Sequence, residues 1–176
     1  GAALAEIRTA TPNQLPHPLK GQPSPNGPRN HPIYVDYLHQ QANELMSNYG
    51  TVDVIWWDYS KQGNDGPFWR ADELMKMVRD EQPAIISNNR LYHITSPADS
   101  SHADRLKAWK PEQGDFTTPE QHIPATGVPG VDWEVCMTMN TTWGYSEHDQ
   151  AWKTNETLIR NLIDIVSKGG NYLLNI

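Results

Sequence analysis

Polar and aromatic side chains follow four short apolar segments of the chain, and their types are those that bind carbohydrates. The residues are Asp58, after segment 52–57; Asn88, Asn89 and Arg90, after 84–87; Asn140 and Trp143, after 133–139; and Asn175, within 172–176. A carboxylate and a guanidinium hydrogen-bond hydroxyl groups, and an indole ring stacks on the apolar face of a pyranose. If the four segments are neighbouring strands, an acid, a cation, amides and aromatic rings converge on one rim, which predicts a sugar site.

Hydrolysis of a glycosidic bond needs two carboxyl groups, so Asp58 requires a partner. The region after the second apolar segment offers three carboxylates, and the third segment contains a fourth: Glu112, Asp115, Glu120 and Glu134. Their spacing does not rank them, because the path of the connecting loop is not predicted. Glu112 and Asp115 are also explained as solvated loop charges, and for Glu134 a structural role is favoured over substrate binding.

Each of these residues also has an ordinary structural explanation. Asp58 could cap a loop, and Arg90 could be a surface residue. Seven tryptophans in 176 residues is a high content, and they lie beside Asp, Glu, Asn and Gly, but tryptophans also fill ordinary cores. The shared position at the ends of apolar segments is the observation that favours a common site.

Helical and strand-like segments alternate along the chain and would position these residues. Helices are predicted at 33–49, 71–81 and 154–168, and strands at 52–57, 84–87, 133–139 and 172–176. The expected inward residues are Tyr34, Leu38, Ala42, Leu45, Tyr49 and Met46 in the first helix; Leu74, Met75 and Val78 in the second; and Leu158, Ile159, Leu162, Ile163 and Val166 in the third. A loop of about 40 residues separates the second and third strands, and loops of this length often carry function.

This alternation predicts an α/β fold with a parallel sheet. About four parallel strands with flanking helices are too few for a closed (β/α)8 TIM-like barrel and fit a partial one. Active sites in such folds lie at the carboxyl ends of the strands, where Asp58 and Arg90 are expected. We expect residues 1–32, rich in Pro and Asn, to be an irregular N-terminal segment or truncation remnant, and residues 33–176 to be the C-terminal half of a barrel domain.

A set of sequence blocks, taken together, carries a family resemblance. The blocks are Tyr34-Val35-Asp36-Tyr37-Leu38, Glu44-Leu45, Asn48-Tyr49-Gly50, Asp53-Val54-Ile55-Trp56-Trp57-Asp58, Gly114-Asp115-Phe116-Thr117-Thr118-Pro119-Glu120, Trp133-Glu134, Met137-Thr138-Met139-Asn140, Trp143-Gly144-Tyr145 and Ser167-Lys168-Gly169-Gly170-Asn171-Tyr172-Leu173-Leu174-Asn175. In this order they resemble the α-L-fucosidases of glycoside hydrolase family 29. They span about residues 26–176, and the combination is far more specific than any single block.

The resemblance implies roles for individual residues. Asp58 matches the family's nucleophile, and Glu120 matches a position associated with the acid/base, which varies across the family. Arg90 matches an arginine near the nucleophile, Trp143 an aromatic residue that packs on the fucose ring, and Trp57 is also expected to bind substrate. The implied reaction is retaining hydrolysis of terminal α-L-fucose through a covalent fucosyl-enzyme intermediate, in which Asp58 attacks while Glu120 first donates and then accepts a proton.

Two departures limit what the resemblance implies. The residue after the nucleophile is small in the family but is Tyr59 here, and the family's first barrel strands, with their sugar-binding histidines, have no counterpart within residues 1–30. We therefore expect a fragment that could be inactive alone. Two alternatives stay open, namely a non-catalytic fucose-binding relative and another retaining hexosidase of the (β/α) barrel class.

Composition and motifs argue against several other classes. The formal charge of −7 disfavours a nucleic-acid or anionic-membrane partner, and no apolar stretch of about 18 residues exists to cross a membrane. His93, His102, His122 and His148 lack ligand spacing, so no metal is expected, nor any cofactor. Cys136, the only cysteine, is expected to be a buried core thiol. The expected partner is a fucosylated glycan or glycoconjugate, an oligomer is compatible with the sequence, and the family suggests a secreted, periplasmic or lysosomal enzyme.

Overall fold

Helices and short strands alternate along the described part of the chain. A computed structural model of the protein describes residues 30–58, 60, 63–92 and 113–176. In chain order the elements are α2 (His31–Asn48), β1 (Val54–Ile55), the 3-10 helix η2 (Gly66–Trp69), α3 (Ala71–Glu81), β2 (Ile86–Ser87), β3 (Phe116–Thr117), β4 (Asp132–Thr138), α5 (Asn155–Ser167) and β5 (Asn171–Asn175). The predicted order of helices and strands is confirmed.

All paired strands are parallel. β1 pairs with β2, and β3, β4 and β5 form a sheet in that order. A parallel bridge between Asn88 and Phe116 connects the two groups. The described part of the chain holds five strands rather than the predicted four, because β3 consists of only two residues inside the segment predicted to be a loop. The mixed α/β class with parallel strands is confirmed.

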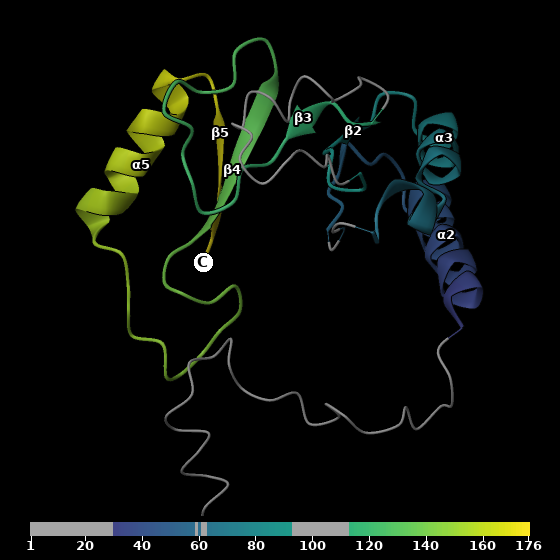
Figure 1. Cartoon of the computed structure of the whole chain (residues 1–176), viewed down its shortest axis with the longest axis horizontal. Coiled ribbons are helices and arrows are strands. Elements are labelled where there is room, and N and C mark those ends of the chain that lie inside the picture. The colour runs from purple at the N-terminus through teal and green to yellow at the C-terminus, as the bar shows by residue number, and fades with distance from the viewer. Residues whose placement is uncertain (1–29, 59, 61–62, 93–112) are drawn as a thin grey trace, which may run out of the picture.

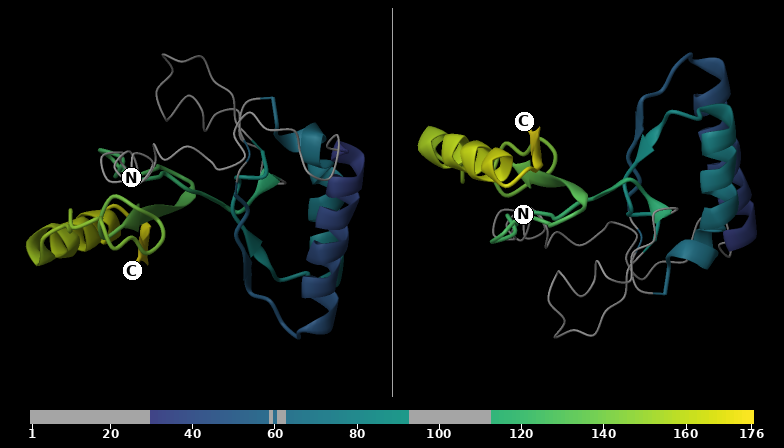
Figure 2. Two further views of the ribbon diagram at one scale, coloured as in Figure 1. Left: turned by 90° about the horizontal axis from the view of Figure 1, so that it is seen from below. Right: turned by 90° about the horizontal axis from the view of Figure 1, so that it is seen from above.

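The helices lie against one face of the strands. α2 and α3 lie together beside β1 and β2, and α5 lies beside β4 and β5 (Figures 1 and 2). Trp57 packs with Leu74 and Val78 of α3 in one core, and Val135 packs with Ile165 of α5 in a second. The inward face predicted for α3 is confirmed, since Leu74 and Val78 are fully buried.

α2 begins two residues before the predicted start at residue 33. The Asn30 side chain accepts a hydrogen bond from the Ile33 backbone N–H at 3.3 Å, and Pro32 lies in the first turn, where a missing N–H costs little. Gly50, with a φ of +85°, follows the end of the helix, as its sequence position predicts. Pro32 therefore belongs to the helix and not to the irregular N-terminal segment, most of which (residues 1–29) lies outside the described residues.

The inward stripes predicted for α2 and α5 are partly wrong. In α2 the buried residues are Val35, Ala42 and Met46, whereas Tyr34, Leu45 and Tyr49 are exposed. In α5 the buried residue is Ile165, whereas Ile159, Leu162, Ile163 and Val166 are exposed. Hydrophobic periodicity identifies an amphipathic helix, but it does not determine which part of a broad apolar surface meets a neighbour. Each helix contacts the described structure along a narrow stripe.

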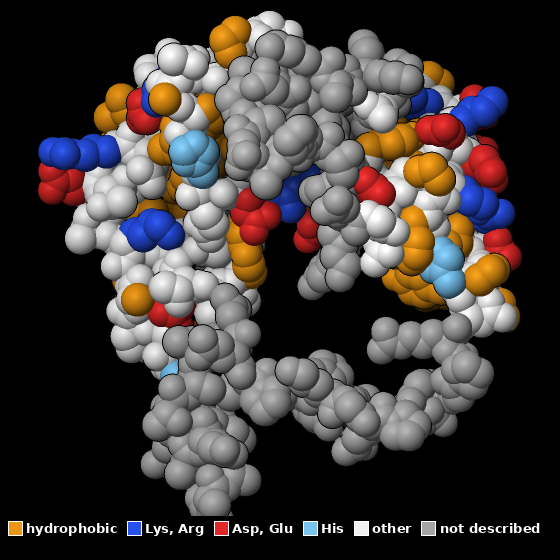
Figure 3. Space-filling model, in the orientation of Figure 1, with side chains coloured by type: hydrophobic (Ala, Val, Ile, Leu, Met, Phe, Trp, Pro, Cys, Tyr) orange, Lys and Arg blue, Asp and Glu red, His pale blue; other side chains and the backbone are white. Residues whose placement is uncertain are grey.

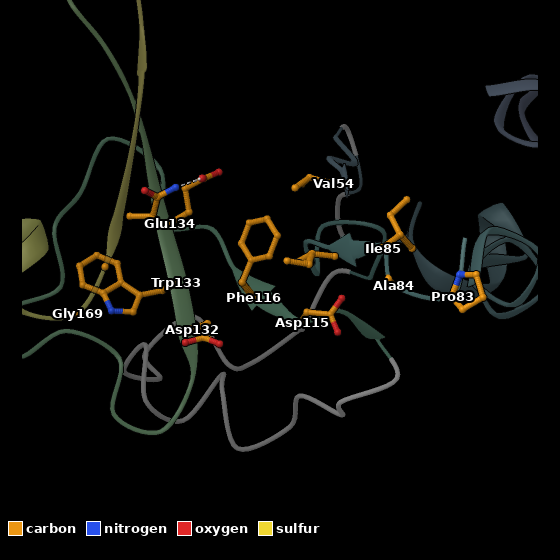
Figure 4. A pocket seen from close by; sticks show the side chains of 13 residues that line it. Val54, Pro83, Ala84, Ile85, Asp115, Phe116, Asp132, Trp133, Glu134 and Gly169 are labelled. Carbon is orange, nitrogen blue, oxygen red and sulfur yellow. Dashed lines mark hydrogen bonds between the residues drawn. The ribbon is translucent and has the colours of Figure 1, made fainter. Parts of the chain in front are cut away.

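A cavity of about 700 Å³ lies at the amino ends of the strands (Figure 4). Val54, Phe116 and Trp133 line it, together with backbone and side chains of β2 and β5. Val54 is 50% exposed, and Leu173 further along β5 is 42% exposed. The face of the strands that carries Val54 and Leu173, here called the inner face, is therefore partly uncovered in the described structure.

Candidate active site

The carboxyl ends of the strands surround a second cavity, of about 470 Å³. Its lining residues are Trp56, Asp58, Arg90, Glu120, Cys136, Trp143, Leu173 and Asn175. Figure 3 shows acidic and basic side chains close together near the middle of the described structure. The volume lies in the range of small-molecule sites, about 300–1,000 Å³. Of the five residues expected at the site, four share this cavity: Asp58, Arg90, Glu120 and Trp143.

One guanidinium joins the two carboxylates. Arg90 Nη1 donates to Asp58 Oδ1 at 2.9 Å, and Arg90 Nη2 donates to Glu120 Oε2 at 2.8 Å. Arg90 Nε donates to Thr118 Oγ1 at 2.7 Å, so all three guanidinium nitrogens have partners. The Arg90 side chain is only 19% exposed, whereas the side chains of Asp58 and Glu120 are 54% and 45% exposed. The carboxylates are thus held by a partly buried cation but remain accessible.

The surroundings of Arg90 keep it charged. Burial alone would lower its pKa, but Cys136 and the hydrogen-bonded carboxylates of Glu120 and Asp58 act the other way, and the pKa of the guanidinium lies above its ordinary value. Arg90 Cζ also lies 4.5 Å from the centroid of the Trp56 ring, which is a cation–π geometry. A permanent positive charge is therefore fixed between the two carboxylates.

The buried side chain of Asn88 holds the ends of β1 and β2 together. Its Oδ1 accepts the backbone N–H groups of Trp57 at 3.1 Å and Arg90 at 3.2 Å, and its Nδ2 donates to the Trp57 carbonyl oxygen at 3.0 Å. A primary amide offers the donor and acceptor of a peptide group, so Asn88 extends the β1–β2 ladder beyond its last backbone pair. Asp58 follows Trp57 directly, and this contact therefore fixes the point from which Asp58 extends.

Glu120 reaches the cavity because its segment pairs with β4. A parallel bridge joins Glu120 to Cys136. The Cys136 N–H donates to the Pro119 carbonyl at 3.2 Å, and the Gln121 N–H donates to the Cys136 carbonyl at 3.0 Å. These contacts lie some 15 residues apart in sequence and could not be inferred from local patterns. They bring Glu120 to the same guanidinium as Asp58.

Of the other three carboxylates considered from the sequence, the two that the structure describes lie elsewhere. Asp115 accepts the Ser87 backbone N–H at 2.7 Å and pairs with Arg79, so it is a structural charge at the amino ends of the strands rather than a freely solvated one. Glu134 lies on β4 at the larger cavity and is hydrogen-bonded within the protein. Glu112 is outside the described residues.

Trp57 does not line the cavity, and Trp56 takes the place expected for it. Trp57 is 8% exposed, packs in the core with α3, and donates from Nε1 to Ser87 Oγ at 3.0 Å. Adjacent side chains of an extended segment point to opposite faces, so Trp56 and Asp58 share one face while Trp57 faces the helices. Counting in steps of two from Asp58 would have selected Trp56 from the sequence.

Cys136 forms part of the cavity wall. It is 2% exposed, and burial raises the pKa of its thiol to about 11, although Arg90 acts in the opposite direction. Arg90 Nη2 lies 3.1 Å from Cys136 Sγ. The thiol is therefore neutral at neutral pH, and the prediction of a buried cysteine is confirmed.

The loop after β4 presents Trp143 to the cavity. Trp143 is 45% exposed, and its carbonyl oxygen accepts a hydrogen bond from the Asn175 side-chain amide. Asp149 braces the loop by accepting the Thr141 backbone N–H at 2.8 Å and the Thr141 hydroxyl at 2.7 Å. The Thr141 hydroxyl in particular holds the pKa of the Asp149 carboxyl below its ordinary value, so the brace persists into mild acid.

The described residues contain no cluster of three or more potential metal-ligating side chains. His122 and His148 are not among the residues lining the cavity, and His93, His102 and Tyr59 fall outside the described ranges. Within those ranges, no helix is long and apolar enough to cross a membrane.

Comparison with known proteins decides the family. A sequence model with the description alpha-L-fucosidase matches residues 10–176. The chain belongs to the alpha-L-fucosidase family. The resemblance expected from the sequence blocks is therefore confirmed, and the match begins earlier than residue 26, where those blocks begin to be recognisable.

Curated alpha-L-fucosidases match most of this chain but are much longer. The tissue alpha-L-fucosidase of Bos taurus is 25% identical over 166 residues, which cover 91% of this chain and 32% of the bovine protein. The alpha-L-fucosidase of Dictyostelium discoideum is 26% identical over 152 residues, covering 82% and 29% of the two chains. This chain thus spans about a third of the length of the curated relatives it matches.

Solved alpha-L-fucosidases share its fold. Isoenzyme 1 from Paenibacillus thiaminolyticus is 38% identical with a TM-score of 0.72, and the match covers 91% of this chain and 37% of that one. The enzyme AlfC from Lactobacillus casei, in complex with its α-L-fucose product, is 30% identical with a TM-score of 0.62, covering 84% of this chain and 40% of that one.

Proposed function

We propose that these residues catalyse retaining hydrolysis of terminal α-L-fucose, with Asp58 as the nucleophile and Glu120 as the acid/base. The observation that carries the proposal is the bridge from Arg90 to both carboxylates inside one cavity at the strand ends. A guanidinium that binds two carboxylates keeps them a few ångströms apart. Such proximity is compatible with the separation of about 5–5.5 Å that retaining enzymes use.

The proposed reaction has two steps. In the first, an Asp58 carboxylate oxygen forms a bond to the anomeric carbon while the bond to the leaving oxygen breaks and Glu120 gives that oxygen its proton. In the second, Glu120 takes a proton from water, the water oxygen bonds to the anomeric carbon, and the ester to Asp58 breaks. Arg90 stabilises the negative charge on Asp58 when it is the attacking and the departing group. No step uses a metal or a cofactor.

The lining of the cavity suits a deoxy sugar. Trp56 and Trp143 offer ring surface to the apolar side of a pyranose, and Asn175 offers an amide to its hydroxyls. One variant of the Lactobacillus casei enzyme has been solved in two complexes, with Fucα(1,6)GlcNAc and with 4-nitrophenyl-α-L-fucopyranoside. A fucosylated glycan or glycoconjugate is accordingly the substrate class proposed here.

The proposed architecture is the C-terminal part of a (β/α)8 barrel formed by residues 33–176. Support comes from the parallel order of the five described strands, from the helices on one face, and from the uncovered inner face. Because the matched relatives are about three times longer, the activity is proposed for the whole protein to which these residues belong.

The test is hydrolysis of an aryl α-L-fucoside by the full-length protein that contains these residues. Asp58→Ala should lower kcat by about 10³-fold or more, because no other group replaces the nucleophile. Glu120→Ala should lower it by about 10²- to 10⁴-fold, and added azide should restore turnover by attacking the fucosyl-enzyme without needing a base.

Asp115→Ala is the matched control, because it removes a carboxylate of the same region that does not contact Arg90 through any described hydrogen bond. Full activity in Asp58→Ala would rule out its role as nucleophile. Fucose binding without any hydrolysis by the wild type would instead support a non-catalytic fucose-binding protein.

A further inference from the structure

Glu134 connects three strands beneath the proposed catalytic residues. It lies on β4, two residues before Cys136, and its Oε1 accepts the indole N–H of Trp56 at 2.9 Å. Its Oε2 accepts the side-chain amide of Asn171, the first residue of β5, at 2.6 Å (Figure 4). β1 and β4 are not neighbours in the sheet, so the contact with Trp56 crosses the inner space that the strands surround.

Trp56 contacts both Glu134 and Arg90. The edge of the indole is held by Glu134, and its face lies under the Arg90 guanidinium at 4.5 Å. Such stacking stabilises the cation and favours one orientation of the plane. A carboxylate at the indole N–H also polarises the ring, which increases its attraction for the cation.

We propose that Glu134 is a positioning residue for the reaction. By fixing the plane of Trp56, it sets the plane of Arg90 and thereby the orientation of the Asp58 and Glu120 carboxylates. Glu134 does not line the cavity that holds these two groups, so it acts through Trp56 and not on the substrate. The inference rests on the proposed function of that cavity.

Two substitutions separate this role from a purely structural one. Glu134→Ala removes both contacts, whereas Asn171→Ala removes only the contact with β5 and leaves the bond to Trp56. In the full-length protein, Glu134→Ala should lower kcat for an aryl α-L-fucoside by about 10- to 100-fold with little change in KM, as expected when catalytic groups are misoriented. Asn171→Ala should retain a kcat close to that of the wild type.

A double-mutant cycle tests the route through Trp56. Trp56→Phe keeps an aromatic ring beneath Arg90 but has no N–H for Glu134, so adding Glu134→Ala to Trp56→Phe should change kcat much less than in the wild type. An equal loss on both backgrounds would overturn the proposal, as would an unchanged kcat in Glu134→Ala. If Glu134→Ala does not fold, Trp56→Phe alone tests the route, because it removes the N–H that Glu134 accepts; an unchanged kcat in Trp56→Phe would then overturn the proposal.

A spectroscopic readout keeps the inference distinct from the function on which it rests. In a ¹H–¹⁵N spectrum of the full-length protein, the indole signal that is missing in Trp56→Phe should move upfield in Glu134→Gln and stay in place in Asn171→Ala. No movement in Glu134→Gln would refute the contact itself, whatever the activity. A moving signal in a protein without Asp58-dependent hydrolysis would leave the contact intact and reject the proposed function.

Discussion

Arg90 is the residue on which the geometry of the proposed site depends. Its guanidinium donates hydrogen bonds to Asp58 from one nitrogen, to Glu120 from another and to Thr118 from the third. A lysine would carry the same charge but only as a point donor on a flexible stem, so it could not hold both carboxylates in fixed orientations. The shape of the guanidinium therefore matters as much as its charge.

Arg90→Lys should accordingly lower kcat/KM for an aryl α-L-fucoside by about 10²- to 10³-fold, the usual cost of removing an oriented electrostatic contact. The matched control is Arg79→Lys, because Arg79 pairs with Asp115 away from the cavity. Steady-state kinetics on both variants provide the measurement. Equal rates for Arg90→Lys and the wild type would show that the bridge is not needed.

Cys136 should make the free energy of unfolding depend on pH in the alkaline range. Burial raises the pKa of its thiol from an ordinary value of 9.0 to about 11 in the folded chain, so the folded state binds this proton more tightly than the unfolded state. The stabilisation is complete below pH 9 and is lost as the pH rises toward 11. The free energy of unfolding, measured with urea, should therefore fall more between pH 8 and pH 10.5 in the wild type than in Cys136→Ala. Equal losses would contradict this assignment.

At the level of secondary structure, the Asn88 side chain joins the ends of β1 and β2. Asn88→Ala leaves the N–H groups of Trp57 and Arg90 and the Trp57 carbonyl without this partner. Unfolding free energy should fall by about 1–3 kcal/mol, the cost of unsatisfied buried polar groups. Asn89→Ala is the matched control, because the Asn89 side chain makes one hydrogen bond, to Thr117 at 3.3 Å. Similar losses in both variants, measured by urea unfolding, would argue against the role assigned to Asn88.

The sequence predicts most helices and strands because their signals are local. α3 matches its predicted bounds, and α5 lies within one residue of them at each end, with Thr154 as the capping residue that accepts the Thr157 N–H. β3 escapes prediction because two residues carry no period. The inward faces of α2 and α5 escape it because their partners are distant in sequence.

The same distinction applies to the candidate site. Asp58 and Arg90 are predictable because Asp58 directly follows one predicted apolar strand and Arg90 lies three residues after the end of the next, and parallel strands end at one edge. Glu120 is selected among four carboxylates only by the pairing of its segment with β4, which is a long-range contact, or by family resemblance. That Trp56 rather than Trp57 faces the cavity with Asp58 is predictable as well, since side chains alternate along a strand and this alternation is visible in the sequence.

On the scale of the whole molecule, the described strands leave apolar surface uncovered. β1 and β5 each have one partner among the described strands, and apolar side chains on the inner face, such as Val54, Ile86 and Leu173, are 42–50% exposed. Ile159 and Ile163 on the outer side of α5 are exposed as well. Together with a match to about a third of each relative, this surface supports assigning activity to the whole protein rather than to these residues alone.

The central claim is that Asp58 becomes covalently fucosylated during turnover. The most direct test is incubation of the full-length protein with a 2-fluorinated fucosyl fluoride, which forms the glycosyl-enzyme but slows its hydrolysis, followed by mass spectrometry of the proteolysed product. We predict one sugar adduct on the peptide that contains Asp58, and none in Asp58→Ala. An adduct on another carboxylate, or inactivation without any adduct, would contradict the account.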